Sequence, residues 1–326
     1  MQNRNDQIDI LRGIGIIAMI LIHVTAWYKT DALAFYFWNS SQFAVQVFNF
    51  CSGYLFFLKE QRREGVFSLK YFAKRATRLL IPYYVFLVFY LPLEIIESPK
   101  RLSLNYILKS FTLTGGPDLN WIILLFLMLA LLMPFLLYLL RSRKLFFFTY
   151  VLLAAFSSLL FLNLELRTYK LIMWLPWSLI ILASWLFVKF HNRITSAYLA
   201  ISCTVTALLL SFYLSVQDHS LLLIDNKYPP NLYYLLYGVA WISGHWFVLS
   251  FLDLKKKAWN IVRFFSVNSY SIFFIHFWVF TFMRVVLKLD LHWGYLFVIV
   301  LMSSVLVQKI INFLSKVLHS KLYAER

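Results

Sequence analysis

The chain has 326 residues, of which 61% are hydrophobic and only 14% charged, and its formal net charge is +17. This composition excludes a water-soluble globule of ordinary design, and it lacks the solvated basic surface that nucleic-acid binding would need. The apolar residues occur in blocks of about 20, the length that crosses about 30 Å of hydrocarbon. We therefore expect an all-α fold, a polytopic integral membrane helix bundle.

Ten apolar blocks follow one another along the sequence, separated by short polar segments. About ten transmembrane helices are expected, at approximately 11–28, 42–58, 79–96, 121–140, 145–163, 171–188, 196–216, 232–252, 266–287 and 294–314. Since no segment between them could form a soluble domain, residues 1–326 are interpreted as one transmembrane domain without an appended soluble domain. Block 11–28 also imitates a secretory signal, but His23 interrupts its apolar run.

The distribution of basic residues predicts the orientation of these helices. With the N-terminus inside, ten crossings return the C-terminus to the same side. The inside segments then hold most of the 31 Lys and Arg residues, including seven between Lys59 and Arg78. Such an excess in short loops is typical of the cytoplasmic side. We therefore expect both termini in the cytoplasm.

The first span carries two polar residues, Arg12 and His23, eleven positions apart. Eleven steps make about three helical turns, so both side chains share a face and lie about 16 Å apart along the axis. A histidine near the middle of a membrane is costly unless it faces a cavity or a partner, which makes His23 a candidate functional residue. The ordinary alternative is a packing histidine bonded to a neighbouring carbonyl.

The second span and the loop after it hold two further signals. Ser52-Gly53 could let a ligand approach the backbone, although close helix packing explains this pair equally well. Arg75 and Arg78 are three residues apart, so they share a helical face on which two guanidinium groups suit phosphate. They could also anchor the helix to lipid head groups. The loop has no Gly-rich phosphate cradle, which argues against a P-loop ATPase.

Later segments add candidates on the outer side. The loops at about 97–120 and 217–231 carry aromatic and amide groups that suit a sugar-like ligand or plain interfacial anchoring, and Asp118 is their carboxylate worth testing. Glu94 is expected to be an exposed interfacial carboxylate. His276 lies about halfway through the ninth span. The two cysteines fall inside spans, where they provide neither a disulfide framework nor a metal site.

Several segments together resemble the acyltransferase-3 family of bacterial integral membrane acyltransferases of the glycan O-acyltransferase type. Each motif is weak alone, but their order and spacing are specific, and the resemblance covers essentially the whole chain. The segments are Ile8-Asp9-Ile10-Leu11-Arg12-Gly13-Ile14-Gly15-Ile16 with His23, Ser52-Gly53, Arg75-x-x-Arg78 with Pro82-Tyr83, and Tyr270-Ser271 with His276.

The resemblance implies transfer of an acyl group, most often acetyl, from cytoplasmic acyl-CoA to a hydroxyl of a cell-envelope or exported glycan. The setting would be the bacterial cytoplasmic membrane. Acyl-CoA would be a co-substrate, with no metal and no permanently bound cofactor. The partners would be a glycan or lipid-linked sugar acceptor and membrane lipids, with no nucleic acid. Separate envelope-biosynthesis proteins could also take part, because no periplasmic transfer domain follows the tenth span.

The resemblance also implies residue roles. The family's catalytic histidine and first-helix arginine carry over to His23 and Arg12, and its Arg-x-x-Arg carries over to Arg75 and Arg78 as the acyl-CoA phosphate site. With the pantetheine arm beside the first helix, the thioester would lie near His23. His23 could then act as a general base or become acylated itself. Arg12 could contact CoA or pair with Asp9.

Supporting or acceptor-side roles are open to His276, Ser52 and Asp118. His276 could orient His23 or the acceptor, or it could simply pack.

Two other classes of protein are compatible with such a chain. A transporter or flippase of a lipid-linked glycan would suit ten spans with buried polar groups, but no internal repeat or paired broken helix is visible. A non-catalytic membrane scaffold or sensor predicts that replacing His23 changes nothing except stability.

Overall fold

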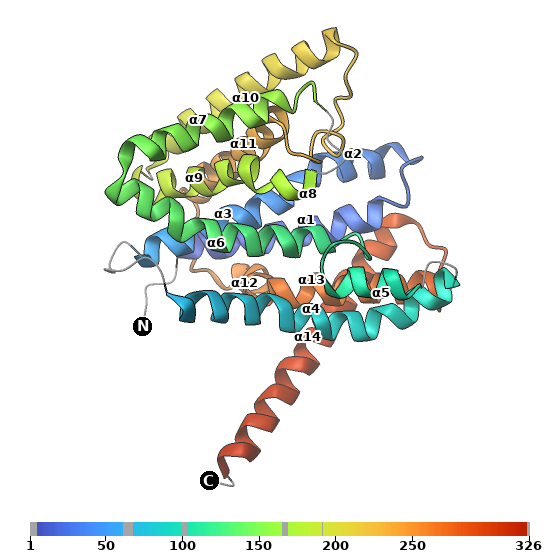
Figure 1. Cartoon of the computed structure of the whole chain (residues 1–326). Coiled ribbons are helices and arrows are strands. Elements are labelled where there is room, and N and C mark those ends of the chain that lie inside the picture. The colour runs from blue at the N-terminus through green and yellow to red at the C-terminus, as the bar shows by residue number, and fades with distance from the viewer. Residues whose placement is uncertain (1–4, 61–67, 100–102, 165–168, 191, 325–326) are drawn as a thin grey trace.

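The computed structural model describes residues 5–60, 68–99, 103–164, 169–190 and 192–324. Over these residues the chain forms helices joined by turns, with one isolated bridge and no strand, so the all-α prediction is confirmed (Figure 1). Some of the basic residues used to predict orientation, among them those at 4, 62 and 63, lie outside the described residues.

A helix lies at each of the ten predicted blocks. These helices are α1 (Asp6–Thr25), α3 (Ala44–Glu60), α4 (Leu69–Glu97), α6 (Asn120–Ser142), α7 (Lys144–Leu160), α9 (Trp174–Phe190), α10 (Arg193–Val216), α11 (Leu232–Leu249), α13 (Ser269–Val285) and α14 (Trp293–Ala324). Shorter helices join them: α2 (Ala32–Ser40), η1 (Ser41–Phe43), α5 (Leu104–Phe111), α8 (Tyr169–Ile172), η3 (Lys257–Trp259) and α12 (Asn260–Val267).

The chain is a multi-pass membrane protein by the length and composition of its helices. Seven helices in the described ranges are long and apolar enough to cross a membrane, and an eighth span results if α12 and α13 are counted together. The two remaining helices, α3 and α7, have 17 residues each. The number of ten crossings and the cytoplasmic termini stay predictions.

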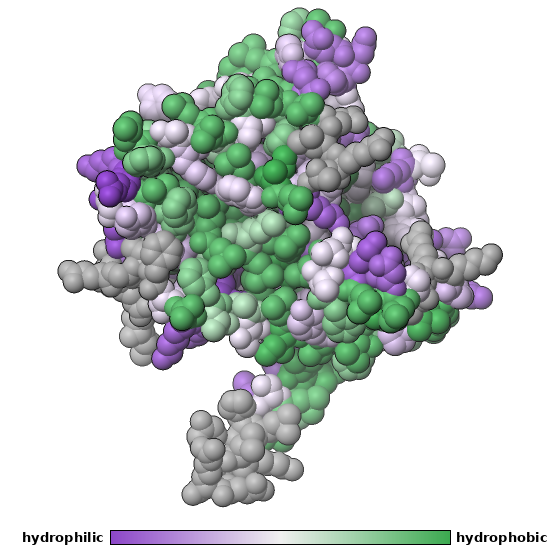
Figure 2. Space-filling model, viewed as in Figure 1, coloured by the Kyte–Doolittle hydropathy of each residue, from purple (hydrophilic) through white to green (hydrophobic). Residues whose placement is uncertain are grey.

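The surface agrees with a membrane setting. Figure 2 shows apolar side chains over the middle of one face, while hydrophilic side chains gather toward its left and right margins. The outermost helices are the least buried, with 17% of the apolar window of α10 buried and 22% of that of α14. These exposed apolar faces would contact lipid, because lipid tails are as apolar as the side chains themselves.

Helix α1 is the centre of the bundle, with 72% of its window buried. Asn5 caps its start by accepting hydrogen bonds from the backbone N–H groups of Gln7 and Ile8. Asp6 and Asp9 add negative charge to the first turn, where the helix dipole favours it. The helix that carries Arg12 and His23 packs against α3, α12, α13 and α14, so both residues lie inside the bundle.

One predicted loop is a helix instead. α12 precedes α13 and meets it at a bend of 78°. It packs closely across the start of α1, where Gly13 makes room, since a Cβ on Gly13 would overlap the backbone carbonyl of Val262. The sequence pattern assigned this segment to an inside loop because basic residues surround it. Its short apolar face is buried against α1 by the tertiary fold.

Candidate active site

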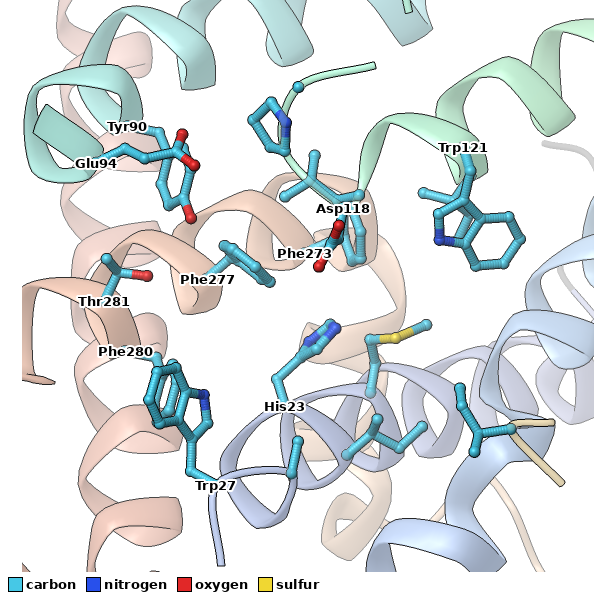
Figure 3. Close-up of a pocket in the computed structure, with 18 of the residues that line it drawn as sticks. His23, Trp27, Tyr90, Glu94, Asp118, Trp121, Phe273, Phe277, Phe280 and Thr281 are labelled. Atoms are coloured by element: carbon cyan, nitrogen blue, oxygen red, sulfur yellow. The ribbon is translucent and has the colours of Figure 1, made fainter. Parts of the chain in front are cut away.

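A cavity of about 860 Å³ opens at one end of the bundle, which we call the cavity end. The opposite end, where Arg12, Lys59 and Arg75 lie, we call the basic end. Helices α1, α4, α6 and α13 and the loop before α11 enclose the cavity (Figure 3). Its wall combines aromatic and charged side chains, including Trp27, Lys29, Trp38, Tyr90, Glu94, Glu97, Asp118, Trp121, Lys227, Phe273 and Phe277.

His23 and His276 form a pair at this cavity. Nδ1 of His23 lies 2.8 Å from Nε2 of His276, and the two rings are stacked with their centroids 5.1 Å apart. His276 is fully buried, while His23 lines the cavity. Figure 3 shows the His23 ring projecting into the space below Phe277 and Asp118. Two histidines that are 253 positions apart in the sequence thus meet at one site.

The hydrogen bonds of His276 determine which nitrogen of each ring carries the proton. Nδ1 of His276 lies 2.9 Å from the carbonyl oxygen of Ile272, which can only accept. Nδ1 of a neutral His276 is therefore the donor, and its Nε2 is left as an acceptor. His23 then donates its Nδ1–H to that acceptor. Nε2 of His23 keeps its lone pair, so it is the nitrogen available for chemistry.

Aromatic rings surround the pair on the remaining sides. Phe277 meets the His23 ring edge-on at 5.1 Å, and Phe273 lies 6.4 Å from it. These rings limit the positions from which water or a substrate can approach the imidazole. Within the described ranges, no group of three or more His, Cys, Asp or Glu side chains is placed to hold a metal ion.

Arg12 lies at the basic end and makes contacts of its own. Its Nη2 is 3.6 Å from Asp9 Oδ1, and its Nε donates to Ser266 Oγ at 3.1 Å. Ser266 in turn donates to Asp9 Oδ1 at 3.1 Å. The expected pairing of Arg12 with Asp9 is therefore present, and the network joins α1 to α12. Arg12 does not line the cavity.

Ser52 and Arg75 are brought together, as Arg75 Nη2 donates a hydrogen bond to Ser52 Oγ between α3 and α4. Arg75 is half-buried, whereas Arg78, one turn further along α4, is exposed. The two guanidinium groups thus differ in their surroundings. Tyr270 fixes this part of α4 to α13 by donating to the Leu79 carbonyl at 2.6 Å.

Glu94 differs from its sequence-based prediction. It is buried rather than exposed, with 5% of its surface accessible, and it lines the cavity. The prediction was wrong because helix α5 folds back over the end of α4, and Tyr106 of α5 donates a hydrogen bond to Glu94 Oε1. Asp118, by contrast, is exposed at the mouth of the cavity.

Lys227 is a cavity residue that the sequence pattern did not single out. It is buried, its Nζ lies 3.2 Å from Gln42 Oε1, and it stands over the rings of Trp121 and Tyr228 at 5.1 and 5.3 Å. In the described part of the chain it forms no ion pair. Burial lowers the pKa of Lys227 from 10.5 to about 7. A lysine in a polar loop looks solvated in sequence, so only its tertiary surroundings reveal it.

The lowered pKa of Lys227 predicts a pH-dependent stability. The unfolded chain keeps this proton up to about pH 10, whereas the folded chain loses it near pH 7. Since the unfolded state binds more protons between these values, stability should rise with pH across that window, by at most about 1.4 kcal/mol per pH unit. Thermal unfolding in detergent between about pH 6 and 10 would measure this rise, and Lys227→Met should remove it.

Lys109→Met is the control for this measurement, because Lys109 is an exposed lysine at the same end of the bundle. It should keep the pH dependence of the wild type. Equal pH dependence in Lys227→Met and in the wild type would contradict the prediction.

The fold and the cavity define a multi-pass membrane protein with a buried histidine pair between its helices. A family model described as an acyltransferase domain, that of the acyltransferase-3 family, matches residues 5–308. The chain therefore belongs to the acyltransferase-3 family, which confirms the resemblance and supports an acyltransferase activity. Searches among curated proteins and among solved structures found no match.

Proposed function

We propose that this protein transfers an acyl group, in the first instance acetyl, from cytoplasmic acyl-CoA to a hydroxyl of a cell-envelope or exported glycan. The observation that carries the proposal is the His23–His276 pair at the cavity. A histidine whose Nδ1–H is engaged and whose Nε2 is free has the arrangement of a general base. The site lies in the bacterial cytoplasmic membrane with the basic end toward the cytoplasm.

The reaction needs one proton to move twice. Nε2 of His23 takes the proton of the acceptor hydroxyl while the hydroxyl oxygen attacks the thioester carbonyl carbon. The new ester bond forms, the carbon–sulfur bond breaks, and the imidazolium returns the proton to the departing thiolate of CoA. While His23 is charged, its Nδ1–H bond to His276 stabilises the charge. In the alternative route Nε2 attacks the thioester itself and expels the CoA thiolate. The acceptor hydroxyl then takes the acyl group from the acyl-histidine, and its proton goes to the thiolate.

Donor and acceptor would approach from opposite ends of the bundle. Arg75 and Arg78 at the basic end suit the phosphates of acyl-CoA, because guanidinium groups bind phosphate bidentately. The level of Arg12 on α1 is about 16 Å along the helix from His23, a plausible length for most of the pantetheine arm. The acceptor would enter the cavity end, where carboxylates and aromatic rings such as Asp118 and Trp121 suit a sugar.

The partners of this reaction are a glycan or lipid-linked sugar and the surrounding lipids. Separate envelope-biosynthesis proteins could present the acceptor at the cavity end.

The bent α12–α13 pair favours a second candidate, a transporter of a lipid-linked glycan. Discontinuous helices form the binding sites of many transporters, where they occur in paired halves of the chain. Only one such pair is found among the described residues. Histidine side chains also relay protons in transporters, so binding of acyl-CoA is the property that separates the two candidates.

The test uses purified protein in lipid nanodiscs with labelled acetyl-CoA. Binding of acetyl-CoA, together with slow loss of its thioester or transfer of label to added glycan, would support the acyltransferase. A protein that binds no acyl-CoA would refute it and favour the transporter. Binding is measured separately from turnover, because a missing acceptor lowers turnover alone.

Arg78→Gln should lower the affinity for acetyl-CoA about tenfold, because it removes charge-assisted hydrogen bonds to phosphate at a partly solvated site. Isothermal titration of acetyl-CoA into nanodisc samples measures the change. Arg143→Gln is the matched control, an exposed arginine between α6 and α7, and it should bind like the wild type. An unchanged affinity in Arg78→Gln would assign this arginine to lipid anchoring instead.

A further inference from the structure

Asn49 on α3 is a buried amide without any hydrogen-bond partner. Its exposed fraction is 0%, and neither Oδ1 nor Nδ2 has a partner among the described residues. Other buried amides there, such as Gln46 and Gln308, have at least one bond, with Tyr234 and Asn312 respectively. Buried polar groups are almost always paired, so a fully orphaned amide requires an explanation. A ligand that both donates and accepts would supply one.

The position of Asn49 on α3 indicates which ligand. Val45, Asn49, Ser52 and Phe56 follow at spacings of four, three and four, so they share one face of the helix. Val45 lines the cavity that contains His23, and Ser52 accepts a hydrogen bond from Arg75. Asn49 lies about 6 Å along the axis from Val45 and about 4.5 Å from Ser52. It therefore stands between the histidine cavity and the arginine at the basic end.

Orphaned groups continue along the same line toward the basic end. Arg75 Nε and Tyr71 Oη, both on α4, are buried and have no hydrogen-bond partner within the described part of the chain. The Tyr71 ring packs 5.7 Å from that of Phe56, so Tyr71 of α4 lies against the same face of α3. The Asn49 amide and these two orphaned atoms thus form a row that ends one helical turn below the cavity.

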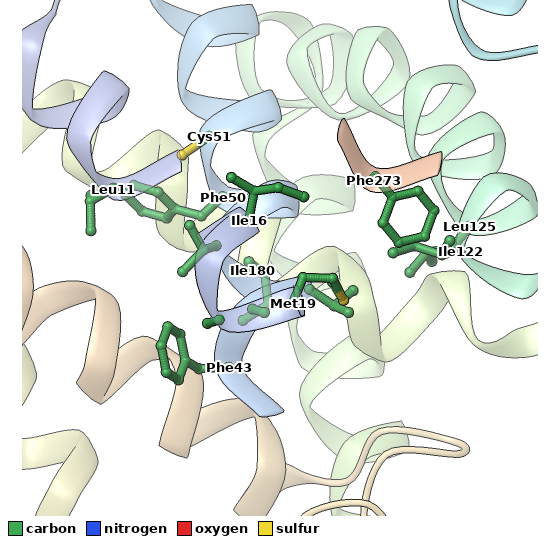
Figure 4. Close-up of a cluster of buried hydrophobic side chains, with 14 of the residues drawn as sticks. Leu11, Ile16, Met19, Phe43, Phe50, Cys51, Ile122, Leu125, Ile180 and Phe273 are labelled. Carbon is green, nitrogen blue, oxygen red and sulfur yellow. The ribbon is translucent and has the colours of Figure 1, made fainter. Parts of the chain in front are cut away.

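The other faces of α3 pack against neighbouring helices. Phe50 meets Phe187 of α9 edge-on at 5.0 Å. Cys51 Sγ lies 3.9 Å from the Ile8 carbonyl of α1. Figure 4 shows Ile16 and Met19 of α1 among apolar side chains that also include Phe273, between α1 and its neighbours. An elongated ligand on the orphaned row would have apolar surface on one side and polar groups on the other.

We propose that Asn49 binds an amide group of the pantetheine arm of acyl-CoA, an inference that rests on the proposed function. The arm is a linear chain with two secondary amides between the phosphates and the thioester. A secondary amide offers one C=O and one N–H, which match the orphaned Nδ2 and Oδ1 of Asn49. A lipid acyl chain would leave both atoms unpaired. Asn49 does not line the cavity, so this binding requires apolar side chains that do line it, such as Met19, to move aside.

The experiment compares two probes in nanodiscs, CoA and adenosine 3′,5′-bisphosphate, which carries phosphate groups but no arm. Asn49→Leu should lower the affinity for CoA about tenfold, the effect of losing two hydrogen bonds. Its affinity for adenosine 3′,5′-bisphosphate should stay that of the wild type. Thermal stability should not fall, because an apolar group replaces an orphaned amide. Gln308→Leu, which removes a buried amide in α14, should bind both probes normally.

Each other outcome counts against one of the two proposals. Wild-type affinity of Asn49→Leu for CoA overturns the inference and leaves the proposed function intact. Equal losses for both probes also overturn it, since the arm is then not involved. A wild-type protein that binds neither CoA nor acetyl-CoA overturns the proposed function itself. If Asn49→Leu is unstable, Asn49→Ala is compared in the same way.

Discussion

His23→Ala is expected to lower turnover of acetyl-CoA by about 10²- to 10⁴-fold, the range that general-base catalysis contributes. The variant loses the nitrogen that takes the acceptor's proton. Its affinity for acetyl-CoA should remain near that of the wild type, because the proposed phosphate and arm contacts lie elsewhere. Labelled transfer or thioester hydrolysis in nanodiscs measures turnover, and thermal unfolding checks the fold.

His245→Ala is the matched control for this experiment. His245 is also a histidine on a helix of the bundle, but it stacks on Trp241 at 4.4 Å and lies in a separate pocket between α10 and α11. Its replacement should leave turnover unchanged. A stable His23→Ala protein with wild-type turnover would exclude His23 from catalysis and support the scaffold or transporter class.

His276→Ala is expected to lower turnover about 10- to 100-fold, which is less than the loss in His23→Ala. His276 is proposed as a positioning residue, since it accepts the Nδ1–H of His23 and thereby keeps the free lone pair on Nε2. Without it, His23 can rotate or change tautomer. The measurement is the same turnover assay, with acetyl-CoA affinity expected to stay unchanged.

The double variant distinguishes positioning from a merely structural role. Residues that act as one unit are non-additive, so His23→Ala/His276→Ala should be no slower than His23→Ala alone. If the two losses multiply instead, His276 acts independently of His23. His276→Gln, which retains an acceptor oxygen, should recover part of the activity lost in His276→Ala.

Much of the fold followed from sequence. The ten predicted blocks each coincide with a helix, because apolar length and polar punctuation are local properties that the bilayer selects. The short helices α2, α5 and α12 were not predicted. They are eight or nine residues long, too short to span a membrane, and isolated helices of this length are marginal in water, so a search for apolar blocks of about 20 residues does not find them.

Part of the candidate site could likewise be predicted from the sequence, and part depends on how the helices pack. The spacing of Arg12 and His23 placed them on one helix, and the structure has both on α1. The contact between His23 and His276 depends on how α1 packs against α13, so the sequence could suggest it but could not establish it. Glu94 was expected at the surface, but it is buried. The prediction failed because nothing in the segment around Glu94 shows that α5 covers it.

The sequence by itself determined the membrane setting, the helical class, the family resemblance and the candidates His23, Arg75 and Arg78. Each of these rests on composition, on spacing within one helix, or on the order of motifs along the chain, and none of these properties depends on how the helices pack. Only the tertiary structure decided that His23 pairs with His276, that Lys227 is buried at the same cavity, and that Asn49 has no partner among the described residues. Burial and pairing are set by residues far away in the chain, so no local pattern records them.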